Sequence, residues 1–259
     1  YAESAVRTLA GMGAAAVPAL EDALHSGDRK LRVNAAKALG MMGPLAAPAV
    51  PALEGTVRTE FSSIQLAAVK ALGEVGPRAG HAVPALRKLL RGRDANLSVA
   101  TAFALWQITG ESRKTVPLLA RALYIDRFGV VRDSSAALAR MGPAARSALR
   151  DIETFRRCCA PMSYDLWQAA AIAEFRAAGR DPRMVRTLCR VLHAEHFESG
   201  DDPRWATEAA RELGNLGAQA RAAIPVLEAV RYRPYADARL RAAATEALEK
   251  IRKASGGGQ

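Results

Sequence analysis

The sequence predicts an all-α protein, built as a solenoid of about seven stacked helical hairpins. Three observations predict this fold: a proline that recurs every 33 residues, a second ladder of leucines and glycines, and apolar residues spaced with the period of a helix. Hydrophobic residues make up 50% of the chain but aromatic residues only 5%. The core must therefore be built from small, closely packed aliphatic side chains, as helices allow.

The first ladder consists of copies of the motif A-V-P-A-L. Its prolines are Pro18, Pro51, Pro84, Pro117 and, later in the chain, Pro225. Two weaker copies place Ser147 and Arg186 in the same column. A proline is tolerated in the opening turn of a helix, because its missing N–H would have no helical partner there. We therefore expect each proline to lie in the first turn of the second helix of its unit.

The second ladder lies between the prolines and has copies such as A-A-K-A-L-G-M-M-G. Its leucine column holds Leu9, Leu39, Leu72, Leu105, Leu138 and Leu213. Its closing glycines are Gly13, Gly43, Gly76, Gly110, Gly142 and Gly217. Glycine takes the left-handed conformation of a helix C-cap without a Cβ clash. Each copy is therefore expected to be a first helix ending at its glycine, so that a unit is helix, tight turn, helix.

The apolar residues of each expected helix fall on one face. Between Leu31 and Met42 they occur at i, i+4, i+7, i+8 and i+11, which fits a period of 3.6 residues. A single hairpin cannot bury such a face alone, so neighbouring hairpins must stack into one continuous core.

The pattern A-L-G-x-x-G-P-x-A-x-x-A-V-P-A-L, seen from Ala38 to Leu53, resembles bacterial HEAT repeats of the phycobilisome-lyase-like class. The resemblance covers nearly the whole chain and implies a right-handed superhelix whose second helices line the concave surface. In this family an Asp, followed four residues later by an Arg, often opens the first helix. Two pairs match, Asp28 with Arg32 and Asp237 with Arg241. We interpret them as structural links between neighbouring turns.

The ladders predict one domain over residues 1–253 and a flexible tail over residues 254–259. No run of 18 apolar residues occurs, so we expect no membrane span. Three cysteines, two of them adjacent, are a poor disulfide framework and favour a cytoplasmic location. The chain starts at Tyr1 without an initiator Met and ends in K-A-S-G-G-G-Q, which leaves room for flanking sequence.

The formal net charge of +11 raises the question of a polyanionic partner. Positions three and four residues past the proline column, and one turn beyond, are basic in the middle units and acidic or neutral at the ends. The basic residues are Arg87, Lys88, Arg91, Arg121, Arg150 and Arg190. We predict that they form a partner-binding stripe on the concave surface, for an acidic protein segment or a phosphate backbone. The alternative is that they are ordinary solvated positions of an arginine-rich chain.

Two longer connections interrupt the repeat spacing, at residues 155–168 and 193–205. The first contains Cys158 and Cys159 beside two arginines, together with Tyr164, which suggests either a reactive thiol pair or small hydrophobic residues. Around the second, Cys189 and His193 lie four apart, and His196 is a third possible metal ligand. We favour the structural interpretation in both cases.

No sequence motif of a serine hydrolase, a zinc protease, a P-loop or a dinucleotide site occurs, so we expect neither catalysis nor a cofactor. The HEAT-like family also includes DNA glycosylases and chromophore lyases. The candidates to line a glycosylase cleft are Trp106, Trp167 and Trp205 with Tyr164 and Asp165. These tryptophans lie on first helices, so we expect core packing instead, and only the repeat itself suggests a lyase.

The predicted function is therefore a non-enzymatic scaffold or adaptor that binds a protein partner, alone or within a larger complex. The partner is expected to be acidic, and a nucleic-acid-binding solenoid is the alternative.

Overall fold

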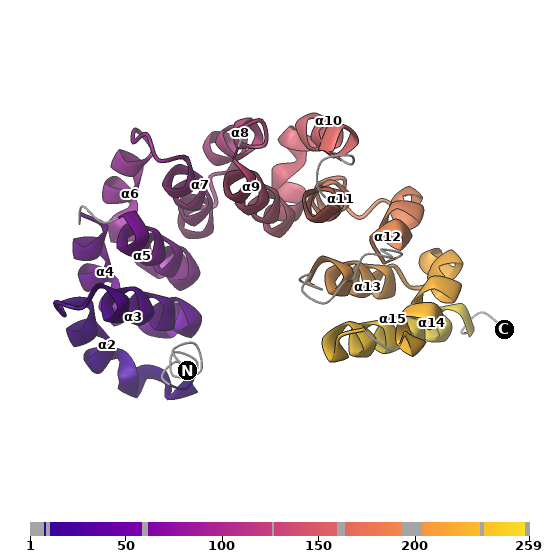
Figure 1. The fold of residues 1–259 in the computed structure, drawn as a ribbon, viewed down its shortest axis with the longest axis horizontal. Helices are drawn as coiled ribbons and strands as arrows, with labels where there is room; N and C mark the ends of the chain where they lie inside the picture. The colour runs from indigo at the N-terminus through magenta and orange to yellow at the C-terminus, as the bar shows by residue number, and fades with distance from the viewer. Residues whose placement is uncertain are drawn as a thin grey trace. The chain divides into compact units, whose positions relative to one another are not determined.

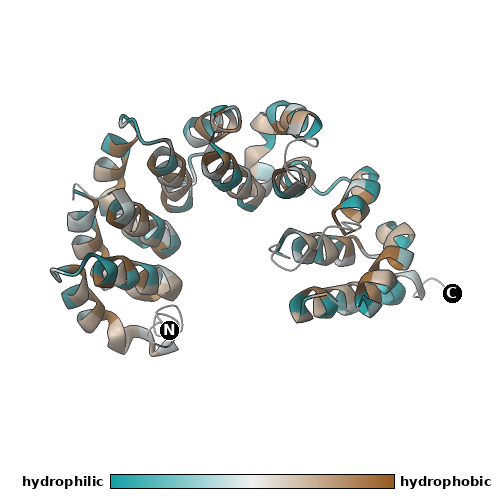
Figure 2. Cartoon of the chain, viewed as in Figure 1, coloured by the Kyte–Doolittle hydropathy of each residue, from teal (hydrophilic) through white to brown (hydrophobic). Residues whose placement is uncertain are grey.

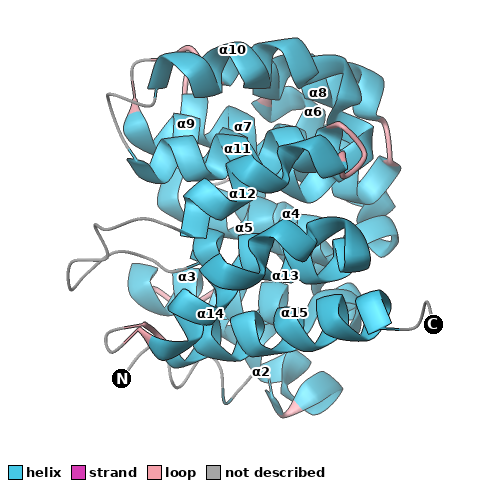
Figure 3. Cartoon of the chain, turned by 90° about the vertical axis from the view of Figure 1, so that its right-hand side faces the viewer, coloured by secondary structure: helices cyan, strands magenta, loops and turns pink. Residues whose placement is uncertain are grey.

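The computed structural model describes residues 8, 11–58, 62–125, 127–159, 164–192, 204–233 and 236–256. All regular elements in these ranges are helices (Figures 1 and 3), which confirms the predicted all-α class. None of these helices is both long and apolar enough to cross a membrane.

Two kinds of helix alternate along the chain. The odd-numbered helices carry the leucine ladder: α3 (Arg29–Met42), α5 (Ser62–Val75), α7 (Ala95–Thr109), α9 (Phe128–Met141), α11 (Tyr164–Ala177), α13 (Arg204–Leu216) and α15 (Ala238–Gly256). The even-numbered helices carry the proline ladder: α2 (Val17–Leu24), α4 (Val50–Val57), α6 (Val83–Leu89), α8 (Ser112–Ala122), α10 (Leu149–Cys159), α12 (Val185–Leu192) and α14 (Ile224–Tyr232). Short 3-10 segments precede most even helices: η1 (Gly13–Ala16), η2 (Gly43–Ala49), η3 (Gly76–Ala82), η4 (Gly142–Ala148), η5 (Pro182–Met184) and η6 (Gly217–Ala223).

Both sequence ladders have the expected structural roles. The six predicted closing glycines have φ values between 54° and 72°, which are left-handed. Gly179, after α11, has a φ of 81° and extends the same pattern. Leu39, Leu72 and Leu138 are fully buried, while Leu9 lies outside the described residues.

The pairing of helices into hairpins differs from the expected one. Most even helices pack against the odd helix that follows them, as α4 does against α5 and α14 against α15, whereas α8 packs against α7, which precedes it. The segment after the glycine is not a tight turn, because in η2 seven residues form a 3-10 helix that carries the chain to the next even helix. Six even helices therefore pair one helix out of phase with the prediction, whereas α7 and α8, joined by a short turn after Gly110, form the predicted hairpin.

The chain divides into two compact units, residues 1–134 (unit 1) and 135–259 (unit 2), with the boundary inside α9. The single domain over residues 1–253 stays a prediction. Helix α15 extends to Gly256, three residues into the predicted tail, and residues 257–259 lie outside the described part of the chain.

Within each unit the odd helices form one row and the even helices another. Apolar segments concentrate where the rows face each other (Figure 2). The odd helices pack directly on one another, as α3 does on α5 and α13 on α15, whereas the even helices contact each other far less. Glycines permit this approach: a Cβ added to Gly40, Gly73 or Gly214 would lie 3.1, 3.0 or 2.8 Å from the Cα of an alanine on the next odd helix.

This difference between the rows fixes the direction in which unit 1 curves. A stack of hairpins bends toward the side on which its helices pack more closely, so the odd helices line the inner side of unit 1 (Figure 1). In hairpins such as α4 with α5 the odd helix is the second one, so second helices do line the inner side of unit 1. What is wrong is the expectation that the proline-bearing even helices are the second helices of their units.

Two even helices depart from the expected register. Helix α8 starts at Ser112, directly after the glycine cap and without a 3-10 segment, so Pro117 lies inside the helix and not in its first turn. Helix α10 starts at Leu149 after a seven-residue η4, so Arg150, not Ser147, lies in the proline position. Ile152 is accordingly the buried counterpart of Leu53, with 1% of its surface exposed.

The predicted Asp–Arg pairs are structural. Asp28 and Asp237 accept hydrogen bonds of 2.7 Å from the backbone N–H groups two residues later, which caps α3 and α15. Arg32 donates from Nε to the carbonyl of Leu24 at 2.9 Å and so joins α3 to the end of α2.

Candidate partner-binding surface

The predicted basic residues fall into two groups. Unit 1 holds Arg87, Lys88, Arg91 and Arg121, and unit 2 holds Arg150 and Arg190. All six side chains are exposed. The four in unit 1 lie on the even row, at the end of α6 and on α8, so they do not line the inner side that was predicted for them.

Of the two residues of unit 2, Arg190 keeps the register of Lys88, since each is the sixth residue of its helix, whereas Arg150 does not. Arg190 lies over the buried ring of Trp167, with its guanidinium carbon 4.9 Å from the ring centroid, a cation–π contact. Arg150 is the second residue of α10, whereas Arg87 is the fifth residue of α6. The position in α10 that corresponds to Arg87 is Glu153, so the column is acidic there.

In unit 1 the end of α6, the connection to α7 and helix α8 enclose a groove, which we call the α6/α8 groove. It holds two cavities of about 280 and 320 Å³, and Leu90 lines both. Arg87, Arg91 and Lys114 border the smaller cavity. The larger one has mainly apolar walls.

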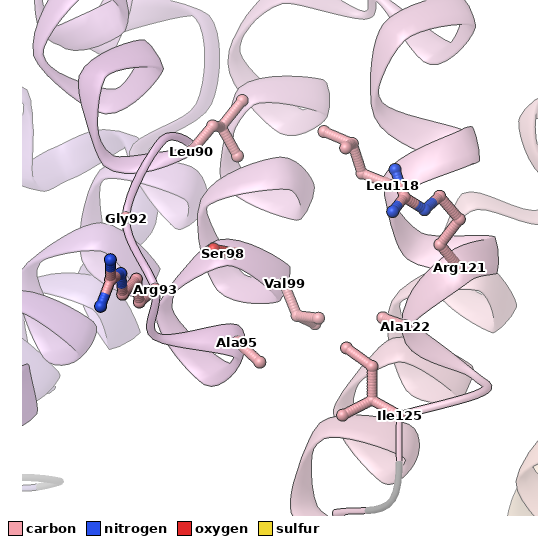
Figure 4. Close-up of a pocket in the computed structure, with 10 residues that line it drawn as sticks. All are labelled: Leu90, Gly92, Arg93, Ala95, Ser98, Val99, Leu118, Arg121, Ala122 and Ile125. Atoms are coloured by element: carbon pink, nitrogen blue, oxygen red, sulfur yellow. The ribbon is translucent and has the colours of Figure 1, made fainter.

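Figure 4 shows how the larger cavity is built. Leu90 and Leu118 approach it from opposite walls, Val99 forms its floor and Ile125 lies at its far end. The guanidinium group of Arg121 lies beside Leu118, whereas that of Arg93 points away from the cavity. The cavity therefore combines an aliphatic lining with a cation on its α8 wall.

The positive charge of this groove is only partly neutralised. The carboxylate of Glu111 lies 3.4 Å from Nη2 of Arg87 and 3.1 Å from Nζ of Lys114. All three side chains are more than 40% exposed, and such exposed pairs contribute little to stability. Lys88, Arg91 and Arg121 have no carboxylate within ion-pair distance in the described part of the chain.

Two apolar residues of the larger cavity are also exposed: Leu118 on α8 by 40% and Ile125, in the turn after it, by 38%. Tyr124 and Phe128, near Ile125 in the sequence, are 57% and 52% exposed. Clustered exposed apolar residues beside charged ones are typical of interaction sites. The spacing of Leu118 and Arg121, three residues apart on α8, was the sequence signal for this face, and the basic column alone did not include Leu118.

A second groove lies between α3 and α5 on the inner side of unit 1, with a volume of about 930 Å³. Lys37, Lys70 and Glu74 line it. Nζ of Lys70 lies 3.5 Å from a carboxylate oxygen of Asp133, and Glu74 places an acidic group in the groove itself. Its charges are thus mixed, and it offers an acidic ligand less attraction than the α6/α8 groove.

Unit 2 contains a partly buried ion network that joins neighbouring repeats. Arg176 on α11 donates to Glu208 at 2.5 Å and to Glu212 at 2.6 Å, both on α13, and Arg180 donates to Glu212 at 3.0 Å. Burial by itself lowers the pKa of Arg176, but hydrogen bonds and charge attraction from Glu208 and Glu212 outweigh it and raise that pKa. Arg156 and Glu174 form another ion pair, between α10 and α11. These pairs are already satisfied, so the network is structural.

Among the cysteine candidates, Cys189 is shielded by burial. Burial raises the pKa of the Cys189 thiol, which disfavours the thiolate that binds metals or acts as a nucleophile. Cys158 is exposed near the end of α10. His193 and His196 lie outside the described residues, as do the side chains of Cys159 and Tyr164. Within the described ranges, no three His, Cys, Asp or Glu residues are placed to hold a metal ion.

Two of the three tryptophans that were expected in the core are buried there. Trp167 and Trp205 are 3% and 4% exposed, as the core interpretation predicts. Trp106 is half-buried and stacks on Phe103 with ring centroids 5.6 Å apart. Asp165 is half-buried at the start of α11. With Trp167 and Trp205 in the core, a glycosylase cleft lacks two of its expected aromatic side chains.

Comparison with known proteins identifies the repeat. Residues 64–92 match the family model of the PBS lyase HEAT-like repeat. The complex of CpcE and CpcF of phycocyanin lyase from Nostoc sp. PCC7120 has a similar structure, with 22% identity over 90% of this chain and 93% of that chain and a TM-score of 0.57. Human deoxyhypusine hydroxylase aligns with 18% identity over 96% of this chain and 89% of that chain (TM-score 0.40). Importin beta aligns with 14% identity over 98% of this chain and 37% of that chain (TM-score 0.47). No curated protein sequence matches this chain significantly.

Proposed function

Because the chain is a HEAT-repeat protein, we propose that it is a non-enzymatic scaffold or adaptor that binds an acidic segment of a partner protein along the α6/α8 groove of unit 1. One observation carries this proposal. Arg91 and Arg121, which have no carboxylate partner in the described part of the chain, lie on the same surface as an open apolar cavity.

The repeat architecture supports a binding function in general. Stacked hairpins use most of their sequence for nearest-neighbour packing, and the faces of the rows remain as extended surfaces for partners. In unit 1 the even helices contact each other little, which leaves room for grooves between them. A protein segment that lies across α6 and α8 would cover such a groove.

An acidic protein fits this surface better than a nucleic acid does. A phosphate backbone is attracted by the arginines and lysines but gains little from an aliphatic cavity. The exposed rings of Tyr124 and Phe128 are the one feature that favours single-stranded nucleic acid, since bases stack on such rings.

Fluorescence anisotropy of the purified protein over a salt series tests the proposal. The probes are a glutamate-rich peptide, a lysine-rich peptide of equal length, and random-sequence single-stranded and duplex DNA. The test variant is Arg91→Glu with Arg121→Glu. Its control is Lys30→Glu with Lys37→Glu, which changes the charge equally on exposed positions of α3.

We expect the glutamate-rich peptide to bind and the lysine-rich peptide not to bind. The α6/α8 variant should weaken glutamate-peptide binding about tenfold or more, because two favourable contacts become repulsive. The α3 control should change it by about threefold or less. Equal losses in both variants would overturn the assignment of the surface. Tighter binding of single-stranded DNA than of the peptide would favour the nucleic-acid function.

A further inference from the structure

We infer that the partner segment is anchored by one bulky aliphatic or aromatic side chain, which inserts between Leu90, Leu118 and Ile125 while neighbouring carboxylates contact Arg121 and Arg91. This inference rests on the proposed function and specifies the chemistry of the partner. A merely acidic segment would leave the larger cavity empty.

The size of the cavity favours a side chain as its occupant. Its volume of about 320 Å³ is at the lower end of the roughly 300–1,000 Å³ range of small-molecule pockets. Its polar groups are few: Ser98 and the guanidinium groups of Arg93 and Arg121, of which that of Arg93 points away (Figure 4). A cofactor would need several polar contacts for its orientation, whereas one apolar side chain requires only walls of the right shape.

The lining gives the anchor its binding energy. Leu118 and Ile125 are 40% and 38% exposed, so each has apolar surface that an inserted side chain would remove from water. Leu90 and Val99 complete the walls from the opposite side and from below (Figure 4). Anchors in such pockets commonly supply most of the binding energy of an interface.

The positions of the arginines fix where the carboxylates of the partner lie. Arg121 lies one helical turn after Leu118 on α8, and both residues line the larger cavity together with Ile125. Arg91 borders the adjoining smaller cavity, which shares Leu90 with the larger one. An anchor in the larger cavity therefore has a cation on either side, which suits an apolar residue flanked by Asp or Glu.

Charge decides against a second copy of this chain as the occupant. The chain has a formal net charge of +11, so a second copy would bring additional positive charge to an already basic surface. The segment that complements the groove is therefore acidic and comes from a different protein.

Two fluorescent peptides of equal charge test the inference. Both have 12 residues of which six are Glu, and their central residue is Leu in one and Ser in the other. The test variant is Leu118→Ser with Ile125→Ser. Its control is Leu45→Ser, which alters another leucine of unit 1 that is 54% exposed. Circular dichroism of each variant confirms that it remains folded.

We expect the Leu peptide to bind about tenfold or more tightly than the Ser peptide, as the burial of one leucine side chain implies. The Leu118→Ser, Ile125→Ser variant should bind the Leu peptide as weakly as the Ser peptide and leave Ser-peptide binding unchanged. The Leu45→Ser control should change neither affinity.

The failures of the two proposals have different signatures. If both peptides bind equally and both lose affinity in the Arg91→Glu, Arg121→Glu variant, the anchor is overturned and the acidic-segment function stands. If neither peptide binds, the proposed function itself is overturned. Loss of Leu-peptide binding in the Leu45→Ser control would also overturn the anchor site.

Discussion

The close packing of the odd helices makes a specific prediction for two glycines of unit 1. Gly73 and Gly55 each lie two residues before the end of a helix, α5 and α4. A Cβ on Gly73 would lie 3.0 Å from the Cα of Ala104 and 2.5 Å from Oε1 of Gln107, whereas a Cβ on Gly55 would meet nothing within 4 Å. Substituting each with alanine isolates the packing of the row, because both sites have the same place in their helix.

The two substitutions should differ in the sign of their effect. Alanine stabilises a helix relative to glycine by about 0.8–1.0 kcal/mol, and this gain applies to both sites. At Gly73 the added methyl group also overpacks the contact with α7, which costs about 1–3 kcal/mol. Gly55→Ala should therefore raise the free energy of unfolding by up to about 1 kcal/mol. Gly73→Ala should lower it by about 0–2 kcal/mol.

Urea unfolding followed by circular dichroism at 222 nm measures both changes. The unfolding midpoints are compared between variants that share the same slope of unfolding free energy against urea concentration. Their difference then reflects stability and not a change in the surface exposed on unfolding. Equal stabilisation by Gly55→Ala and Gly73→Ala would refute the reasoning that glycine is needed for the approach of the odd helices.

Three further predictions follow from the same structure. Arg176→Met removes the one guanidinium group that pairs with both Glu208 and the buried Glu212, and we expect it to lower the free energy of unfolding by about 2–4 kcal/mol in urea titrations. A loss below about 0.5 kcal/mol would contradict a buried network. Pro117→Ala should raise the free energy of unfolding by about 1–3 kcal/mol in the same assay, because this proline lies inside α8. Pro84, in the first turn of α6, is the control, and its replacement by alanine should give no such gain. Cys189 should react with iodoacetamide at pH 8 more slowly than the exposed Cys158, since burial raises the pKa of the Cys189 thiol. Residue-resolved mass spectrometry measures both rates, and equal rates would contradict the protection of Cys189 by burial.

The sequence predicted the helices better than it predicted their arrangement. The closing glycines and the leucine column fixed where the odd helices end and which side they bury, because both features are local. Except at α7 and α8, the pairing into hairpins was wrong by one helix, since the G-P-x-A-x-x-A segment resembles a turn in sequence but forms a 3-10 connection. The register of α10 failed for a similar reason, because Leu149 there takes the place of a valine that precedes the proline.

The candidate site could be predicted only in part. Arg87, Lys88, Arg91 and Arg121 were found because a repeat register brings equivalent positions together, but the row that faces inward depends on how closely helices pack. The glycines of the A-L-G motif indicate which row faces inward, because they allow the odd helices to approach one another closely. The apolar walls could not be found in this way, because Leu90, Val99 and Leu118 come from three elements that meet only in the folded unit.

Photo-crosslinking tests most directly the central claim that unit 1 binds an acidic, apolar-anchored segment in the α6/α8 groove. The Leu peptide is made with a diazirine analogue of leucine at its central position, irradiated in complex with the protein, and the attachment sites are mapped by mass spectrometry. We predict attachment within residues 90–99 and 118–125, which line the larger cavity. Attachment concentrated around Met41 and Leu66 in the groove between α3 and α5, or in unit 2, would contradict the claim.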